Sequence, residues 1–398
     1  MKTAMMSSAI AAVSLILAAP VSAQGVKIGI LNDQSGVYAD YGGKGSIEAA
    51  KIAIEEFGGS VLGHPVELVT ADHQNKPDLA AAIGRRWYEV DNVDMITELT
   101  TSSVALAIHE LSKQMKKIDI VVGAASSRVS GDACQPYGFH WAFDTRALGY
   151  STGGALTKAG GDTWFFLTAD YAFGHSLEKD TGDFVKANGG KVLGAVRHPL
   201  NTADFSSFLL QAQGSKAKIV GLANAGLDTS NAIKQAAEFG IVASGQKLAG
   251  LLLTLAEVHG LGLQAAQGLV LTESYYWDRD DNSRNFANRY FKAMGKMPSM
   301  IQAGTYSSVL SYLKAVKAAG TKDTEAVTKK LKELPVSDSF AKSGKVLANG
   351  RMVADVYLFE VKKPAESTKP WDYYKLIATV PGDQAYPTAA DSGCPLTK

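Results

Sequence analysis

The chain has 398 residues, with 40 Lys or Arg and 39 Asp or Glu, so its formal net charge is only +1. This balance argues against the basic stripe of a nucleic-acid-binding protein and the polybasic patch that binds anionic lipid headgroups. The hydrophobic content of 46% is ordinary for a globular α/β protein, and the length exceeds what one core usually supports, so we expect two domains.

The N-terminus has the anatomy of a secretory signal peptide. Lys2 supplies a positive n-region, an apolar run extends from Ala9 to Ala19, and Val21-Ser22-Ala23 forms a small-residue cleavage site. A membrane anchor fits less well, because the apolar run is shorter than the roughly 20 residues that span a bilayer. We therefore expect residues 1–23 to be removed after Ala23, which leaves a protein of the periplasm. The residue directly after the cleavage site is Gln24 rather than a cysteine, which argues against a lipid-anchored form.

Strands and helices alternate along the first third of the chain. The apolar run 26–31 is typical of a buried strand, and residues 45–57 repeat apolar side chains at helical spacing until two glycines end the helix. The same alternation predicts strand 65–71, helix 77–90, strand 93–97, helix 102–115 and strand 118–124. This order is typical of a parallel sheet with helices on both faces.

The alternation restarts near residue 144, after a break at residues 134–149. The second unit is predicted to contain strands 162–170, 191–199, 217–225, 246–253 and 267–274, with helices 174–190, 204–214 and 228–240 between them. Further helices and strands are expected at 282–295, 305–320, 323–334, 344–347 and 355–360. These late elements are too few for a third domain, so we expect the chain to cross between two α/β units more than once.

The glycine-rich segment 29–45 joins the first strand to the first helix, where many proteins bind phosphate. A Walker loop aligned on Gly43-Lys44 has Tyr38 in place of its first glycine and Gly45 in place of its Ser or Thr. The dinucleotide pattern fails as well, because Glu48 stands where the third glycine must pack. The segment is therefore predicted to border another kind of ligand.

Open α/β sheets bind ligands beyond the carboxyl ends of their strands. Hydroxyl, amide and aromatic side chains follow several predicted strands here, and each alone is also explained as an ordinary cap or turn. Together they indicate a polar and aromatic cleft between two facing sheets, and its candidate residues are Tyr41, Thr101, Ser102, Ala124, Ser126, Tyr171, Phe173 and Asn224.

Six motifs, in this order and spacing, resemble the periplasmic solute-binding proteins of ABC transporters in the branched-chain amino acid (Leu/Ile/Val-binding) class. They are VKIGILNDQSGVYADYGGKGSIEAAKIAIEEFGG, HPVELVTADHQNKPDLA, TTSS, DYAFG, DFSSFLLQAQ and AGTYSSVLSYLKAV. The resemblance implies two doubly wound parallel-sheet lobes joined by a three-crossover hinge, the clamshell of a type I periplasmic binding protein. Such a protein closes on a small solute and presents it to a membrane permease, without enzymatic activity or a cofactor, and we expect a monomer.

The resemblance also divides the mature chain. Lobe 1 is expected to comprise residues 24–144 with about 278–335, and lobe 2 about 145–277 with 336–370. Residues 371–398 are expected to form a C-terminal tail.

The resemblance places ligand contacts on both lobes. It implies an aromatic side chain in the first loop, a helix start that holds the ligand carboxylate, and a second set of carboxylate and amine contacts. It also implies an aromatic position in the second lobe and an aromatic lid. The first-loop aromatic is Tyr41, and the helix start is Thr101 or Ser102. The second set of contacts is Ala124 (through its backbone) with Ser126. The aromatic position of the second lobe is Tyr171 or Phe173, and the lid is Tyr306.

One departure from the family concerns the ligand's ammonium group. Amino acid binders of this class carry an acidic residue after the strand predicted at 246–253, but Leu251–Leu253 and a threonine occupy that place, and the nearest acid there is Glu257. Because a buried ammonium without a counter-charge is costly, either Glu257 or Asp228 substitutes, or the ligand is not an α-amino acid. We favour an organic acid with an apolar or aromatic body. Arg197 is a candidate cation for its carboxylate, or else a solvated surface arginine.

The two cysteines, Cys134 and Cys394, are expected to form one disulfide in an oxidising compartment, although two unpaired thiols are an alternative. The bond would tie the tail to lobe 1. The seven histidines are scattered, without a GxSxG or HExxH motif, which argues against a hydrolase or a metal site. Binding of amino acids or small amides, or a sensor that delivers solute to a receptor, remain alternatives on the same fold.

Overall fold

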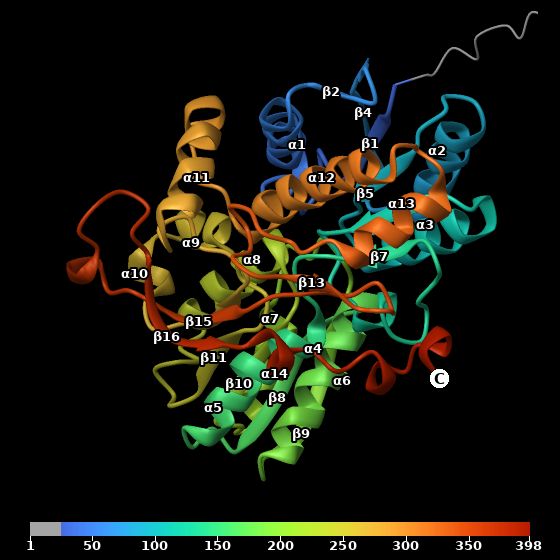
Figure 1. Ribbon diagram of the computed structural model, residues 1–398. Coiled ribbons are helices and arrows are strands. Elements are labelled where there is room, and N and C mark those ends of the chain that lie inside the picture. The colour runs from blue at the N-terminus through green and yellow to red at the C-terminus, as the bar shows by residue number, and fades with distance from the viewer. Residues whose placement is uncertain (1–24) are drawn as a thin grey trace, which may run out of the picture.

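The computed structural model describes residues 25–398, so the predicted signal peptide and its cleavage site lie outside the described residues. Two parallel sheets covered by helices form the two lobes, and the C-terminal strands run between them (Figure 1). Among residues 25–398, no helix is both long and apolar enough to cross a bilayer.

Lobe 1 contains a five-stranded parallel sheet in the order β4-β1-β5-β6-β7. Its central strands are buried on both faces because helices cover both sides, which explains their continuous apolar runs. The strands are β1 (Lys27–Asn32), β4 (Glu67–Asp72), β5 (Met95–Glu98), β6 (Ile118–Val121) and β7 (Gly138–His140), with a small hairpin of β2 (Ser60–Val61) and β3 (His64–Pro65). The helices are α1 (Gly43–Phe57), α2 (Pro77–Glu89), α3 (Ser102–Met115), α11 (Asp281–Met294), α12 (Met300–Ala319) and α13 (Thr324–Glu333).

After β12 the chain returns from lobe 2, and both α11 and α12 pack against α1, so late residues complete the first lobe. Helix α12 begins with a capping box, in which the Ser299 backbone N–H donates to Gln302 Oε1 at 2.8 Å. Most of its residues are buried, so α12 is a core helix rather than a surface helix.

Lobe 2 contains a four-stranded parallel sheet in the order β11-β10-β8-β9. Its strands are β8 (Thr163–Ala169), β9 (Lys191–His198), β10 (Ile219–Ala223) and β11 (Lys247–Gly250). Its longer helices are α6 (Ala172–Ala187), α7 (Ser206–Gly214) and α8 (Gly226–Glu238), and its shorter ones are α4 (Thr145–Leu148), a π-helix (Gly149–Gly153), α5 (Gly154–Lys158), α9 (Leu255–Leu261) and α10 (Leu263–Ala266).

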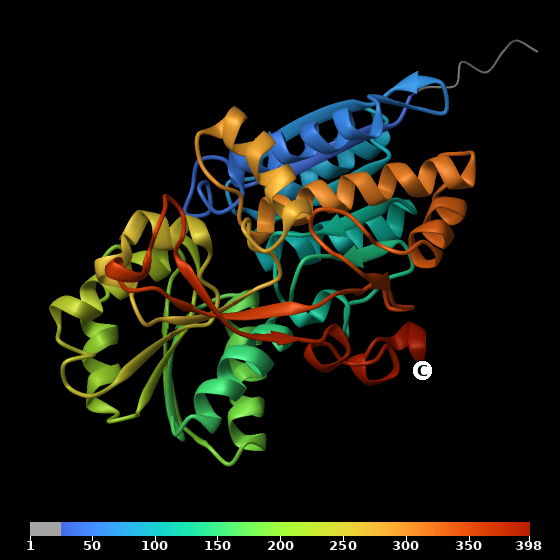
Figure 2. The same ribbon diagram turned by 60° about the vertical axis from the view of Figure 1, so that its left-hand side comes forward.

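A third, antiparallel sheet lies where the chain passes between the lobes. It pairs β12 (Val270–Glu273), β15 (Val356–Val361) and β16 (Tyr374–Val380). Figure 2 shows the red C-terminal strands beside the crossings. Strand β16 falls in the stretch expected to be a tail, so that stretch begins with regular structure; β13 (Lys345–Val346), β14 (Met352–Val353) and α14 (Gly382–Ala385) complete the region. The chain passes between lobes after β7, after β12 and after α13, and the predicted fold class is confirmed.

Arg351 joins two of these crossings. It is 1% exposed, and its guanidinium donates to the carbonyl oxygens of Trp141 at 2.8 Å and Phe143 at 3.0 Å. The Asp144 carboxylate lies 3.7 Å from Nε, and the ring of Tyr386 lies against the guanidinium at 4.2 Å. Arg351, a buried cation on the third crossing, therefore contacts both the first crossing and the C-terminal segment.

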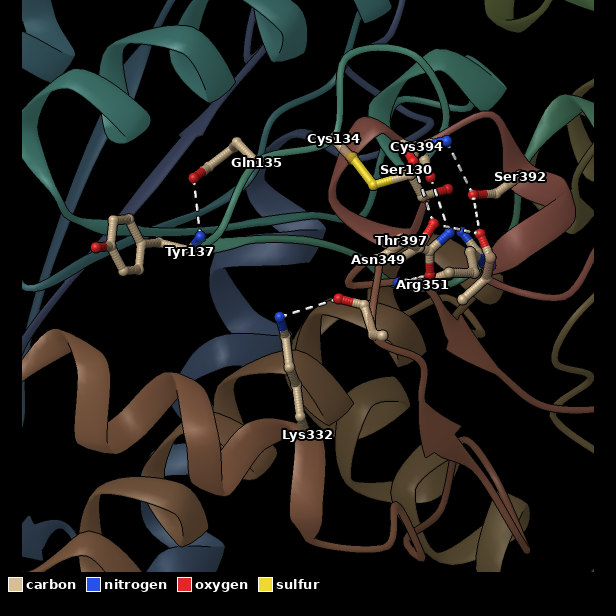
Figure 3. The surroundings of a disulfide bond; sticks show 12 residues. Ser130, Cys134, Gln135, Tyr137, Lys332, Asn349, Arg351, Ser392, Cys394 and Thr397 are labelled. Carbon is tan, nitrogen blue, oxygen red and sulfur yellow. Dashed lines mark hydrogen bonds between the residues drawn. A yellow bond between two sulfur atoms is a disulfide. The ribbon is translucent and has the colours of Figure 1, made fainter.

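The predicted disulfide between Cys134 and Cys394 is confirmed (Figure 3). Their Cα atoms are 5.6 Å apart although the residues are 260 positions apart in sequence. Nearby, Asn349 Nδ2 donates to the carbonyl oxygen of Ser130 at 2.8 Å. The disulfide thus holds the end of the chain against the lobe 1 loop that follows β6, and Asn349 joins the turn between β13 and β14 to the same loop.

Candidate functional site

A cavity lies between the lobes, at the carboxyl ends of strands from both parallel sheets. Its lobe 1 wall comes from the segments after β1, β5 and β6, and its lobe 2 wall from the segments after β8, β10 and β11. Its volume is about 10 Å³. We call it the interlobe cavity, and it is lined by Tyr38, Tyr41, Thr100, Thr101, Ser102, Gly123, Ala124, Ala125, Tyr171, Phe173, Ala225 and Leu252.

The start of α3 provides the polar part of the cavity. Ser102 Oγ accepts a hydrogen bond from the Ser126 backbone N–H at 3.1 Å, which leaves its own hydroxyl hydrogen to donate elsewhere. The Thr101 hydroxyl donates to Asn75 Oδ1. Because the first turn of a helix has unpaired N–H groups and the positive end of its dipole, this end of the cavity favours an anion.

Four aromatic side chains provide another part of the wall. The hydroxyl groups of Tyr38 in lobe 1 and Tyr171 in lobe 2 are 2.6 Å apart, so they form a hydrogen bond between the lobes. Tyr41 donates to the carbonyl oxygen of Gly123 at 3.2 Å, and the Tyr171 and Phe173 rings are 5.8 Å apart. Burial raises the pKa of Tyr38, Tyr41 and Tyr171 above the ordinary value, so these phenols stay neutral.

Contacts beside the cavity bring the lobes together. The Leu227 backbone N–H donates to the Val37 carbonyl oxygen at 3.2 Å, and the hydroxyls of Ser126 and Ser176 are 2.7 Å apart. Gly226 has a φ of +63°, and a Cβ there would lie 2.6 Å from the Val37 oxygen. A glycine is therefore needed where α8 approaches the first loop of lobe 1. The structure has the two lobes closed around the cavity.

Six residues proposed from the sequence line this cavity: Tyr41, Thr101, Ser102, Ala124, Tyr171 and Phe173. Ser126 lies immediately beside it, and its hydroxyl faces Ser176 rather than the cavity wall.

Three other proposed residues do not line it. The Arg197 side chain is 48% exposed and contacts Glu178 at 3.4 Å. It is therefore a solvated arginine on the surface of lobe 2, the second of the two interpretations. Asn224 is buried, but its side-chain amide is hydrogen-bonded to His198 and Thr229.

Tyr306 is a core residue. Its hydroxyl donates to Glu56 Oε1 at 2.6 Å, and its ring packs against Phe286 with centroids 4.6 Å apart. It therefore joins α12 to α1 and α11 inside lobe 1, away from the cavity. Tyr38, three positions before Tyr41 in the same loop, also lines the cavity, although it was not among the candidate residues.

None of the acidic side chains among residues 25–398 lines the interlobe cavity. Glu257 forms a capping box with Thr254, whose backbone N–H donates to it at 2.7 Å. Asp228 accepts from the backbone N–H groups of Asn201 and Thr202, at 3.1 and 2.9 Å. Burial raises the pKa of both acids to about 6. Neither of the two substitutes considered for the missing counter-charge reaches the cavity.

Comparison with known proteins identifies the family. The sequence pattern described as "Periplasmic binding protein" matches residues 25–368. The chain belongs to this family. Its fold is similar to that of a periplasmic binding protein from Burkholderia mallei, which is 54% identical, with a TM-score of 0.93 over 94% of this chain and 100% of that chain.

One further solved structure connects the chain to transport, and another shares its fold. A branched-chain amino acid ABC transporter periplasmic ligand-binding protein from Burkholderia xenovorans is 40% identical, with a TM-score of 0.84 over 94% of this chain and 100% of that chain. A solute-binding protein of an ABC transporter from R. palustris, in complex with benzoate, is 21% identical, with a TM-score of 0.82 over 93% and 99% of the two chains, and so shows the shared fold alone. The protein is a solute-binding protein of an ABC transporter, of the type I periplasmic fold, rather than an enzyme.

Proposed function

We propose that the protein binds a small organic acid with an aromatic or otherwise apolar body and delivers it to the permease of an ABC importer. The observation that carries the proposal is the composition of the interlobe cavity. Its wall combines the α3 helix start, aromatic rings and Leu252, and no acidic side chain of residues 25–398 lines it to neutralise an ammonium group. A carboxylate suits the helix start, and an apolar ring suits the aromatic wall.

The cavity has little free volume in the closed form. Its volume of about 10 Å³ is close to what one water molecule needs, and well below the roughly 300–1,000 Å³ typical of ligand pockets. A ring bearing a carboxylate would therefore require the lobes to stand further apart than they do here. The benzoate complex of the R. palustris protein supports the proposal in so far as the same fold accommodates such an acid.

The proposal includes how the ligand is enclosed and where the protein works. The hydrogen bond between Tyr38 and Tyr171 and the contact between Ser126 and Ser176 would form as the lobes close over the solute. We further propose that the mature chain begins after Ala23 in the periplasm and acts as a monomer.

A ligand panel tests the ligand class. Thermal unfolding of the mature protein should shift upward, saturably, with benzoate or 4-hydroxybenzoate and not with leucine, isoleucine or valine. Benzamide is the matched control, because it keeps the ring and the size of benzoate but lacks the charge. A shift with branched-chain amino acids alone would overturn the proposed ligand class. An equal shift with benzamide would contradict a carboxylate at the α3 helix start.

Two single variants test the location of the carboxylate. Ser102→Ala removes a hydroxyl that is placed to donate to the ligand, and should weaken benzoate binding roughly ten- to a hundredfold, as expected for a lost hydrogen bond to a charged group. Arg197→Ala should leave the affinity unchanged, because the arginine lies on the surface of lobe 2. The opposite result would move the carboxylate site to Arg197.

A further inference from the structure

Glu98, the last residue of β5, is a buried carboxyl group behind the wall of the interlobe cavity. It is 0% exposed. Its Oε2 accepts hydrogen bonds from the backbone N–H of Thr100 at 2.7 Å and from the Thr100 hydroxyl. Its own carbonyl oxygen accepts from the backbone N–H of Gly123 at 2.8 Å. Because Thr100 and Gly123 both line the cavity, Glu98 holds two of its wall segments together.

The other carboxyl oxygen reaches the third lobe 1 segment of the wall. Glu98 Oε1 accepts from Ser46 Oγ, in the first turn of α1, at 3.1 Å. Asn32 Nδ2, which donates to the Gly43 carbonyl at 2.8 Å, lies 3.5 Å from the same oxygen. A side chain at Gly42 would collide with Oε1, so the loop that carries Tyr38 and Tyr41 packs closely over this carboxyl group.

The backbone around Glu98 has an unusual conformation. Glu98, Leu99 and Thr101 have φ values of +77°, +57° and +73°. Residues other than glycine rarely adopt this region, β-branched threonine least of all, and they remain there only when the surroundings hold them. The hydrogen bonds from Thr100 to Glu98 lie inside this run, immediately before α3. The position of the α3 helix start therefore depends on the Glu98 carboxyl group.

We propose that Glu98 is a positioning residue for the ligand, and that its carboxyl group takes up one proton when a carboxylate occupies the α3 helix start. The inference rests on the proposed function, because it requires an anionic ligand at that place. The proton comes from solvent and forms an O–H bond at Oε1, the one covalent bond that changes. This O–H then donates a hydrogen bond to Ser46 Oγ, whose own hydrogen turns away from Oε1. Protonation removes the repulsion between two carboxylates on opposite sides of one wall.

The charge states near Glu98 permit this coupling. Burial raises the pKa of the Glu98 carboxyl to about 7, so near neutral pH it is already partly protonated. The ligand stays ionised, because carboxylic acids ordinarily titrate near pH 4. His73, which contacts the Thr100 backbone, has a pKa lowered by burial to about 4 and is neutral in this range, as is the Tyr41 phenol.

Three more acids act electrostatically on the tyrosines of the cavity and titrate in the same region. Glu257 and Glu273 act on Tyr41, and Asp228 acts on Tyr38 and Tyr171. Burial raises their pKa values to about 6, 8 and 6, respectively. Because wild type and a Glu98 variant both contain these three acids, their effect on the pH dependence of binding cancels in the ratio of the two affinities.

The test uses isothermal titration calorimetry with benzoate as the probe, on wild type and Glu98→Gln, at pH 6 and pH 8. Glutamine keeps the acceptor for Thr100 and donates to Ser46 as the protonated acid would. We expect both proteins to bind within threefold of each other at pH 6, and the variant to bind about tenfold more tightly at pH 8. Titrations in two buffers of different ionisation enthalpy should show wild type taking up close to one proton at pH 8, and the variant fewer.

Glu273→Gln is the matched control. Glu273 is equally buried, and its oxygens accept from the Leu255 and Met300 backbones and from the Tyr374 hydroxyl, none of which lines the cavity. It should keep the wild-type dependence on pH. Loss of that dependence in this control would overturn the assignment to Glu98.

The outcomes separate this inference from the proposed function. Benzoate binding without proton uptake in wild type, or an equal weakening of Glu98→Gln at both pH values, overturns the inference and leaves the ligand class standing. Absence of benzoate binding by both proteins at both pH values refutes the proposed function, and with it the anion on which the coupling depends. A tighter-binding variant is a result that misfolding does not produce.

Discussion

The hydrogen bond between Tyr38 and Tyr171 should contribute to ligand affinity, because it joins residues of opposite lobes over the cavity. The two hydroxyl oxygens are 2.6 Å apart, Tyr38 is 2% exposed, and the bond exists only when the lobes meet. Replacing either tyrosine by phenylalanine removes the bond and leaves the other hydroxyl in a largely dry place. A lost bond costs about 0.5–1.5 kcal/mol, and an orphaned buried group about 1–3 kcal/mol.

A loss of about 1–2 kcal/mol, confined to the closed form, raises the dissociation constant roughly 5- to 30-fold. We expect this increase for Tyr38→Phe and for Tyr171→Phe, measured by calorimetry with the tightest-binding acid of the panel. The double variant leaves no orphaned hydroxyl, so its affinity should resemble that of a single variant rather than the product of both losses. Thermal unfolding of the ligand-free variants checks that the lobes fold normally. Strictly additive losses, or affinities within twofold of wild type, would refute the reasoning.

Three further predictions concern stability. Arg351→Met leaves two buried carbonyl oxygens at the first crossing without their charged donor, and should lower the free energy of unfolding in urea by about 3–5 kcal/mol; a loss below about 1 kcal/mol would contradict that role. Joint replacement of Cys134 and Cys394 by serine should cost on the order of 5 kcal/mol, given their separation of 260 residues, and reductant should then have no further effect. Burial raises the pKa of the Glu273 carboxyl to about 8, whereas in the unfolded chain it is near 4. The stability that this carboxyl contributes is therefore fully present below about pH 4 and is lost as the pH rises through 8. The stability of Glu273→Gln relative to wild type should therefore increase by up to about 1.4 kcal/mol per pH unit between about pH 5 and pH 8, and a flat difference in urea titrations would refute this.

The strands and most of the cavity residues could be predicted from the sequence because both depend on local patterns. Buried parallel strands give continuous apolar runs, and the topology of a parallel sheet brings the segments after those strands to one edge. Thr101, Ala124 and Tyr171 each follow a strand, and the fold brings them together without any contact having to be known in advance.

For Arg197, its position at a strand end was not enough, because the direction of its side chain also had to be considered. Along β9, the side chains alternate between exposed and partly buried positions, and Arg197 has the same parity as Lys191, which is exposed. A strand-end residue faces a ligand only when its parity points it there, so alternation alone argues for the surface. Tyr306 failed for another reason: its partners, Glu56 and Phe286, come from distant helices that the sequence does not place beside it.

The contact that Tyr38 makes with the other lobe and the role of Glu98 could not be predicted from local sequence patterns. The contact of Tyr38 with Tyr171 joins two lobes and spans 133 positions of sequence. The importance of Glu98 comes from a backbone run with positive φ, which the residues Glu, Leu and Thr do not suggest, and from the close approach of Gly42.

The four buried acids around the cavity decide what kind of ligand it suits. Their number alone would suggest a site for a cation, but in each case the carboxylate oxygens face protein donors. Glu98 accepts from Thr100 and Ser46, Asp228 from two backbone N–H groups, Glu257 from its own helix cap, and Glu273 from two backbone N–H groups and a tyrosine. A site for an ammonium group would present such oxygens to the cavity, since a buried cation needs a partner within contact distance. The interlobe cavity instead presents hydroxyls, rings and a helix start, so the arrangement of the acids, rather than their count, favours the proposed anion.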